Sequence, residues 1–535
     1  MTQAYINGKF YTGNGRFAQA VLVADGRFAL IGNNGDILAA AGGNVVDLGG
    51  RTVLPGFNDS HMHLYSVGVQ LNSLKLGDCT SIADCITAGR AYLEGKRIPP
   101  GRPVLGYLWN QESFTDERRN LTRHDLDKIS TAHPILALRA CSHIVSCNTM
   151  ALKMAGITAN TPDPQGGEIG HDADGTPNGV LAENAMELIS GLADNPTIDE
   201  MTATIKAAMT HASRHGITSV QTNDVRDGNW QNMLAAYGRL YDQAQDQAPL
   251  RTNHQCFFST PAGLRDFITS GNITGRGNDM HKIGPLKMFV DGSLGGRTAA
   301  LQHPYNDAPH TSGILTMTSA QLDEMIQIAH AAGMSCVIHA IGDGAMALVL
   351  AAYEKVISGG NNRLRHGIIH CQITDAPILK RMAASNVLAL VQPIFLHSDI
   401  KMIENRVGAD RAAASYAWAA MDSLGIPVSY GTDAPIEGLC PIRNIHCAVN
   451  RQDLAGQPSG GFYPAQRVNL PAAIDNYTIG SAYASFDENK KGRIAPGFLA
   501  DMCVLDKDIF AMDPSKIIHT QVDMTILGGR IVYTR

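Results

Sequence analysis

Residues 335–357, SCVIHAIGDGAMALVLAAYEKVI, join a short apolar run to an amphipathic stretch. The run 335–339 is typical of a buried strand, and 345–357 carries apolar residues at helical spacing. The same unit recurs through the middle of the chain. Apolar runs lie at 52–57, 216–221, 251–258, 285–290, 335–339, 367–370, 387–392 and 427–430, with helical stretches at 202–215, 319–332, 345–357 and 376–384. Eight strands alternating with helices predict an α/β fold, a TIM-type (β/α)8 barrel.

Both ends of the chain are rich in strands instead. Short apolar runs separated by Asn-Gly, Asp-Gly and Gly-Gly pairs occur in residues 1–55, and similar runs return near the C-terminus. We therefore predict one small β-sandwich domain built from residues 1–55 and 488–535, beside a barrel of residues 56–487. Residues 70–200 interrupt the barrel pattern after its first strand. We expect them to form an inserted subdomain over the barrel mouth.

The composition of the 535 residues is that of an ordinary globular protein, with 44% hydrophobic and 17% charged residues. The net charge of −6 gives no basic surplus to neutralise phosphates, so nucleic-acid binding is not expected. The longest apolar stretches, such as 387–391, fall far short of the ~20 residues that span a membrane. Because the N-terminus has neither a basic nor an apolar leader region, we expect a cytoplasmic location and no membrane partner.

Side chains that can bind a metal ion follow several of the predicted strands. LPGFNDSHMHL, residues 54–64, carries His61 and His63, and residues i and i+2 of an extended segment point to the same side. His339 and His370 each close an apolar run, and Asp433 follows the last run. Active sites of (β/α)8 enzymes lie at this face of the barrel. These ligand types predict a catalytic divalent metal, with Zn²⁺ as the first choice and Fe²⁺ or Mn²⁺ as alternatives.

Lys287 lies within the apolar run of GPLKMFVDGS, residues 284–293. A lysine that points into a barrel must be paired or modified, because an isolated buried ammonium group is costly. A structural salt bridge is one alternative for Lys287, and membership of the metal site is the other.

These residues, together with longer motifs, resemble the amidohydrolase superfamily. The motifs cover most of the chain: PGFNDSHMHL, GYLWNQESF, HPILALRACSHIVSCNTMAL, GGEIGHDADGTPNGVLAENA, KMFVDGSLGGRTAAL, HAIGDGA, GTDAPIEGLCP and GRIAPGFLADMCVLD. They are similar to the branch that contains N-substituted formamide deformylases. The resemblance implies a metal-dependent amidohydrolase that acts on carbon–nitrogen bonds other than peptide bonds in a small-molecule substrate. It also makes a homodimer the expected assembly.

The resemblance further implies a two-metal site with six ligands: His61, His63, Lys287, His339, His370 and Asp433. The first two histidines would hold one metal, and the two histidines that follow the fifth and sixth strands would hold the other. A carboxylated Lys287 would bridge the metals. Asp433 would bind the first metal and act as the catalytic acid and base. If Lys287 is not carboxylated, the alternative is a one-metal site without Lys287 and His370.

Four further residues are candidates for substrate contact: Trp109, His143, Asp291 and Arg297. Trp109 ends an apolar run of the inserted segment, and His143 stands where the family motif has a histidine. Asp291 and Arg297 follow the strand of Lys287, and a structural salt bridge is an equal alternative for them.

The leading functional prediction is hydrolysis of the C–N bond of an amide, an N-substituted formamide or a cyclic amide. Deaminases of the superfamily tend to carry His-x-x-Glu after strand five, whereas Gly342 stands at the Glu position here. Deamination of a heterocycle and hydrolysis of an ester or lactone remain alternatives. A non-hydrolytic isomerase or a barrel that only binds a ligand is a further class, but no dedicated base for an isomerase is evident.

Overall fold

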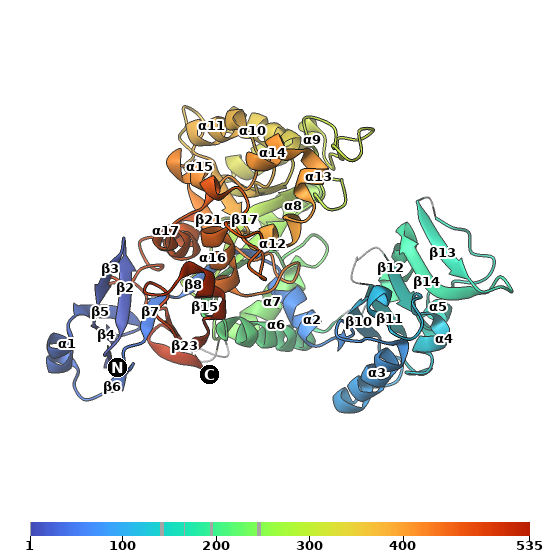
Figure 1. The fold of residues 1–535 in the computed structure, drawn as a ribbon, viewed down its shortest axis with the longest axis horizontal. Coiled ribbons are helices and arrows are strands. Elements are labelled where there is room, and N and C mark those ends of the chain that lie inside the picture. Colours follow the sequence, from blue (N-terminus) through green and yellow to red (C-terminus); the bar gives the residue numbers. More distant parts are fainter. Residues whose placement is uncertain (1, 140–143, 165, 193–195, 243–247) are drawn as a thin grey trace. The chain divides into compact units, whose positions relative to one another are not determined.

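The computed structural model describes residues 2–139, 144–164, 166–192, 196–242 and 248–535. These residues form two compact units (Figure 1). Unit 1 contains residues 1–67 and 205–535, and unit 2 contains residues 68–204. The predicted insert, 70–200, therefore lies within unit 2. Among the described residues, no helix combines the length and apolar character needed to cross a membrane.

Unit 1 contains an eight-stranded parallel sheet whose strands follow one another in sequence order. Its strands are β8 (Phe57–Met62), β15 (Ile217–Thr222), β16 (Arg251–Phe257), β17 (His281–Phe289), β18 (Cys336–Ala340), β19 (Gly367–His370), β20 (Leu388–Val391) and β21 (Val428–Tyr430). At the carboxyl ends of β8 and β21, the amide of Asp433 donates to the carbonyl of His61 and the amide of His63 donates to the carbonyl of Ala434, both at 2.8 Å. These bonds join the outer strands, so the predicted (β/α)8 barrel is nearly closed.

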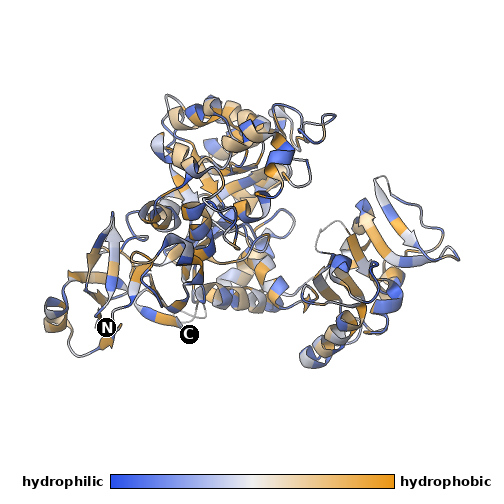
Figure 2. Ribbon diagram, in the orientation of Figure 1, coloured by the Kyte–Doolittle hydropathy of each residue, from blue (hydrophilic) through white to orange (hydrophobic). Residues whose placement is uncertain are grey.

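Helices follow most of the barrel strands, and Figure 2 shows that they carry both hydrophobic and hydrophilic residues. This pattern is expected for helices with one face against a sheet. The longer ones are α6 (Ile198–Ser213), α7 (Trp230–Asp242), α8 (Pro261–Thr269), α9 (Ser319–Ala331), α10 (Asp343–Val356), α11 (Ala376–Ala384) and α16 (Pro441–Asn450). The shorter ones are α12 (Phe395–Asp399), α13 (Ile403–Val407), α14 (Ala409–Ala413), α15 (Trp418–Ser423), α17 (Leu470–Asp475) and α18 (Ser481–Ala484).

Both chain ends build two further sheets. A four-stranded sheet has the order β5-β4-β1-β6, and a six-stranded sheet has the order β24-β23-β22-β7-β2-β3. Their bounds are β1 (Thr2–Ile6), β2 (Lys9–Gly13), β3 (Arg16–Ala18), β4 (Ala20–Ala24), β5 (Arg27–Gly32), β6 (Val45–Asp47), β7 (Thr52–Pro55), β22 (Met502–Leu505), β23 (Val522–Leu527) and β24 (Arg530–Thr534). Tyr5 and Val21 from the first sheet share one buried cluster with Phe10, Val53 and Met502 from the second.

The prediction of the first barrel strand at 52–57 is wrong. Residues 52–55 form β7, which pairs with β2 and β22 of the terminal sheet. The barrel strand begins only at Phe57, after Gly56, and pairs with β15. His61 consequently lies inside the strand and His63 directly after it. Both segments are buried, but β8 reads FNDSHM and carries mostly polar residues, so apolar character does not identify it as a barrel strand.

Unit 2 is a six-stranded mixed sheet in the order β13-β14-β12-β11-β10-β9. Its strands are β9 (Leu74–Lys75), β10 (Val104–Trp109), β11 (Ile135–Arg139), β12 (Ile144–Cys147), β13 (Gly167–His171) and β14 (Pro177–Glu183); its helices are α3 (Ile82–Lys96), α4 (Arg123–Leu126) and α5 (Thr149–Met154). Along β11, Ile135 and Ala137 join one hydrophobic cluster and Leu136 joins another. Since successive side chains of a strand point to opposite faces, the sheet has a core on each face.

A buried ion pair connects the barrel to the terminal sheets. Arg251, at the start of β16, donates from Nε and Nη2 to the two carboxylate oxygens of Asp501, at 2.7 and 2.9 Å. Both side chains are buried. Replacing Arg251 with Met should lower the free energy of unfolding by about 3–5 kcal/mol, because the Asp501 carboxylate would lose its partner while still buried. Urea denaturation checks this, with the exposed Arg265→Met as control; equal stability of the two variants would contradict it.

Candidate metal centre

Three ligand-type side chains meet at the carboxyl ends of the first and last barrel strands. Nε2 of His61 lies 3.3 Å and Nε2 of His63 lies 3.1 Å from Oδ1 of Asp433. The ligand atoms of the three residues lie within 4.8 Å of one another. Asp433 and His61 are buried, yet Oδ1 of Asp433 has no hydrogen-bond partner among the described residues. A buried oxygen without a hydrogen bond, facing two imidazole nitrogens, fits a shared metal ion.

The imidazole of His61 is oriented by Gln255, at the end of β16. Nδ1 of His61 lies 2.5 Å from Oε1 of Gln255, and the amide nitrogen of Gln255 donates to the carbonyl of Ser60 at 2.9 Å. This second bond turns the amide oxygen towards the imidazole. An oxygen acceptor requires a proton on Nδ1, so the neutral ring keeps its lone pair on Nε2.

A glutamine also orients the imidazole of His370, the last residue of β19. Nδ1 of His370 lies 2.8 Å from Oε1 of Gln392, whose amide nitrogen donates to the carbonyl of Leu390. Nε2 of His370 is therefore the nitrogen with a lone pair. The ring centroid of His370 lies 5.8 Å from that of His61 and 4.4 Å from that of His339. The structure thus brings the histidines of three different strands together.

The remaining two histidines differ from each other. Nε2 of His339 lies 3.0 Å from the carbonyl oxygen of Gly292, which leaves the lone pair on Nδ1. Nδ1 of His63 lies 3.3 Å from Nη2 of Arg226, which is a donor, so this contact fixes no N–H on the ring. Hydrogen bonds to oxygen therefore set the tautomer of three of the four histidines in the form that binds a metal.

Lys287 is fully buried in β17, as its place in an apolar run predicts. Its Nζ has no hydrogen-bond partner among the described residues and lies 4.3 Å from the centre of the Phe289 ring. Burial lowers the pKa of Lys287 to about 7, although the nearby carboxylate of Asp433 opposes this shift. Among the described residues, Lys287 therefore lacks the partner that the salt-bridge alternative requires. An amine with this pKa is partly neutral and nucleophilic near pH 7.

The electrostatics of the cluster favour the protonation states that bind metals. Burial lowers the pKa of His61 and of His370 well below the usual range, with the charge of Lys287 or His339 adding to the effect. Burial opposes ionisation of Asp433, but His61 and His63 outweigh it and hold the pKa of that carboxyl below its usual range. Neutral imidazoles and an ionised carboxylate at neutral pH are the ligands that a divalent metal requires.

Asp59 orients the backbone rather than an imidazole. Its carboxylate accepts from the amide of His61 at 3.2 Å and from the amide and hydroxyl of Thr432, at 3.1 and 2.7 Å. It therefore ties the segment of His61 to the segment of Asp433. Gln255, and not Asp59, contacts the imidazole of His61.

Removing the Gln255 contact should weaken metal binding. Gln255→Leu leaves Nδ1 of His61 without its acceptor, so we expect the affinity for Zn²⁺ to fall about 10–100-fold. Competition with a chromophoric chelator measures the affinity. The matched control is Gln221→Leu, since the buried amide of Gln221 donates to the carbonyl of Ser481 and touches no imidazole in the structure. Equal affinities of the two variants would contradict the assignment.

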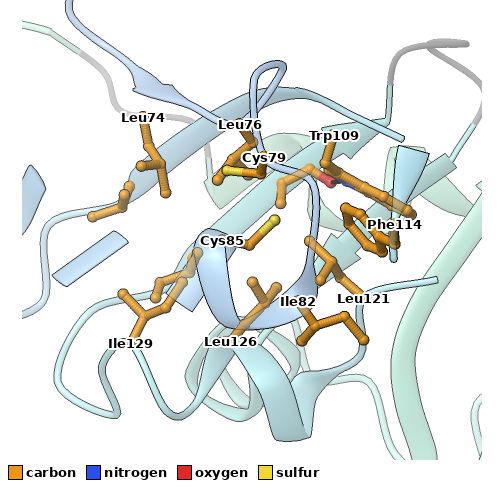
Figure 3. Packing of buried hydrophobic residues seen from close by; sticks show 13 residues of the cluster. Leu74, Leu76, Cys79, Ile82, Cys85, Trp109, Phe114, Leu121, Leu126 and Ile129 are labelled. Atoms are coloured by element: carbon orange, nitrogen blue, oxygen red, sulfur yellow. Dashed lines mark hydrogen bonds between the residues drawn. The ribbon is translucent and has the colours of Figure 1, made fainter. Parts of the chain in front are cut away.

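The structure does not support substrate contact for Trp109. Its ring is fully buried in the core of unit 2, beside Phe114 in Figure 3, and its Nε1 donates to the carbonyl of Ala137 at 2.8 Å. A bulge in β10 at Leu108, which has a φ of 74°, exposes Leu108 and turns Trp109 into the core. His143 lies outside the described residues.

Asp291 and Arg297 have structural partners. The carboxylate of Asp291 accepts from the amides of Ala300, Ile341 and Gly342, at 2.9, 3.1 and 2.8 Å. It lies 3.3 Å from Nε2 of His339 and so positions this candidate ligand and the loop after it. Arg297 forms a two-pronged ion pair with Asp307. The salt-bridge alternative therefore holds for Arg297, whereas Asp291 binds backbone amides.

Sequence reasoning missed Gln255 and Gln392. Gln392 is a buried polar residue directly after the apolar strand β20, the same signal that drew attention to the histidines. Gln255 instead lies among other buried polar residues of β16, RTNHQCF. The signal identifies an inward-facing polar group but not its partner on another strand.

Fold and site together define a metal-dependent hydrolase of the (β/α)8 type. The chain belongs to the amidohydrolase family, whose model matches residues 44–533. It is 32% identical to the protein YtcJ of Bacillus subtilis (strain 168), over 92% of this chain and 90% of that protein. It is 27% identical to the N-substituted formamide deformylase of Arthrobacter pascens, over 97% and 95% of the two chains.

A solved structure resembles nearly the whole chain. It is an uncharacterized metal-dependent hydrolase from Pyrococcus horikoshii OT3, with a TM-score of 0.80 and 28% identity, covering 96% of this chain and 99% of that one. An adenosine deaminase from Xanthomonas campestris shares only the fold, with a TM-score of 0.52 and 12% identity. The predicted family is thereby confirmed.

Proposed function

We propose that the protein hydrolyses the C–N bond of a small-molecule amide, N-substituted formamide or cyclic amide. The reaction takes place at a site for two divalent metal ions, for which zinc is the first choice. The observation that carries this proposal is the buried group of His61, His63 and Asp433, with an oxygen of Asp433 free of hydrogen bonds. The neighbouring Lys287, buried without a partner among the described residues, supplies the reason for a second ion.

His61, His63 and Asp433 would hold the first metal, and His339 and His370 the second. When bound, the metals supply a water acidified to a pKa of about 7 and polarise the substrate carbonyl. The carboxylate of Asp433 takes a proton from the attacking water and returns it to the leaving nitrogen. Gln255 and Gln392 keep the imidazoles of His61 and His370 in the orientation that this requires.

Lys287 would join the two halves of the site as a carbamate. Its neutral amine attacks carbon dioxide, a new N–C bond forms, and one proton leaves to solvent. The product is an anion with two oxygen ligands. The step replaces a positively charged ammonium group, which is costly to bury, with a negatively charged carbamate, which two metal cations attract.

The chain carries no carboxylate at the position that marks the deaminases. Gly342 stands there, and its amide donates to Asp291. This favours amide hydrolysis over deamination of a heterocycle. Ester and lactone hydrolysis use the same attacking water and are included in the test.

The test is a substrate panel with the zinc-loaded protein in bicarbonate buffer. The panel contains N-alkylformamides, cyclic amides, aminoheterocycles and simple esters, and chromatography identifies the products. We expect release of an amine from one of the amides and loss of this activity on chelation. Release of ammonia from a heterocycle alone, or cleavage of esters alone, would contradict the proposal.

A further inference from the structure

A mainly apolar, partly open cavity lies beside the candidate metal centre. Its volume is about 290 Å³, and it lies at the carboxyl ends of β16 and β17 and against α9. Its described lining includes seven apolar residues: Phe257, Phe258, Pro261, Met288, Phe289, Met317 and Met325. The proposed reaction uses none of them.

The lining has the chemistry of an apolar binding site. Aromatic rings and thioethers supply most of the wall, and none of the described lining residues is charged. The lining also includes three polar residues: Ser259 and Thr316, which carry hydroxyl groups, and Gln321, which carries an amide. The amide oxygen of Gln321 already accepts from Thr318 at the start of α9. Methionine packs against apolar groups of varied shape, so the wall suits alkyl or aryl groups.

Phe289 is a wall shared by the cavity and the metal centre. Its ring centre lies 4.3 Å from Nζ of Lys287 and 5.2 Å from the ring centre of His339. The ring also contacts Phe257, with centroids 5.4 Å apart. Phe289 therefore lies between the residues of the candidate metal centre and the cavity that it lines.

The loop over the cavity is fixed in place. The amide of Thr316 donates to the carbonyl of Val290, and its hydroxyl donates to the carbonyl of Phe289, both at 2.8 Å. Thr318 and Gln321 form a capping box at the start of α9 directly after this loop. The cavity is thus formed before any ligand binds, which reduces the entropic cost of binding.

We propose that this cavity binds an apolar substituent of the substrate, an alkyl chain of several carbons or one aromatic ring, while the scissile C–N bond lies at the metal centre. The inference rests on the proposed function and deepens it. An apolar cavity of about 150 Å³ accommodates benzene, and whole drug-sized ligands need about 300–1,000 Å³. A cavity of 290 Å³ therefore has the size of one substituent rather than a whole substrate.

The first test compares substrates of increasing length. N-methyl-, N-butyl- and N-hexylformamide place the chain on the amine side, and N-methylacetamide, N-methylbutanamide and N-methylhexanamide place it on the acyl side. We expect kcat/KM to rise about fourfold for each methylene buried, in one of the two series. The series that responds identifies the half of the substrate that enters the cavity. No dependence on length in either series would overturn the proposal.

The second test fills the cavity. Met317→Trp should abolish the rise of kcat/KM with chain length. Ile314→Trp is the matched control, because Ile314 lies in the same loop, is exposed, and does not line the cavity. A length dependence that persists in Met317→Trp would overturn the proposal.

A binding measurement separates this inference from the proposed function. Saturation-transfer NMR with toluene on the unmodified protein should show binding that Met317→Trp removes and Ile314→Trp retains. Toluene binding without hydrolysis of any amide would sink the proposed reaction but leave the cavity as an apolar site. Amide hydrolysis without toluene binding would overturn the cavity assignment alone.

Discussion

Replacing Asp433 with Asn is expected to lower kcat by about 10²–10⁴-fold. The amide neither takes a proton from water nor returns one to the leaving nitrogen, and general acid–base catalysis contributes this range. The shape of the side chain is kept, so the backbone bond between Asp433 and His61 should persist. Initial rates on the best amide of the panel give kcat.

The matched control for this prediction is Asp410→Asn. Asp410 is exposed on α14, away from the three-residue metal group. Circular dichroism and metal content of both variants distinguish a lost proton transfer from a lost fold or a lost ion. A kcat for Asp433→Asn within threefold of the unmodified protein would exclude Asp433 as the acid and base.

Replacing Lys287 with Met should reduce the metal content from two ions per chain to one and remove most of the activity. The thioether is close to the lysine stem in size but supplies no carbamate. Since an unpaired ammonium group is no longer buried, thermal stability in the absence of metal should be unchanged or higher. Elemental analysis and differential scanning calorimetry measure the two effects.

Lys282→Met is the control for Lys287, because Lys282 lies in the same strand and donates to Asp487 and to the carbonyl of Ser485. It should lower stability and leave two metals bound. Carbon-13 NMR in labelled bicarbonate should show a carbamate signal that Lys287→Met removes. Two metals per chain in Lys287→Met, or the same signal, would contradict the bridging role.

The barrel could be predicted from the sequence because its pattern is repeated. Seven of its eight apolar runs correspond to strands β15–β21, and the stretch 376–384 matches α11 to the residue. The failure at 52–57 has a physical cause. Two buried strands adjoin there, and which sheet a short apolar run joins depends on pairing with residues far along the chain, such as Cys503 for Leu54 and Ile217 for Phe57.

The meeting of His61, His63 and Asp433 could be predicted from the sequence for a similar reason. Ligand-type residues at strand ends meet because parallel strands bring their carboxyl ends to one face of a barrel. Gln255 and Trp109 show what the sequence does not determine. The partner of a buried amide lies on another strand, and a single bulge at Leu108 decides which way an aromatic ring points.

The central claim is that this chain is a hydrolase with two metal ions, and metal content per chain tests it most directly. The protein should be purified without chelator, in the presence of bicarbonate, and measured by elemental analysis. Two divalent ions per chain is the predicted result. One ion per chain would contradict the two-metal site and the bridging role of Lys287. No ion after reconstitution with zinc, iron or manganese would contradict metal-dependent hydrolysis altogether.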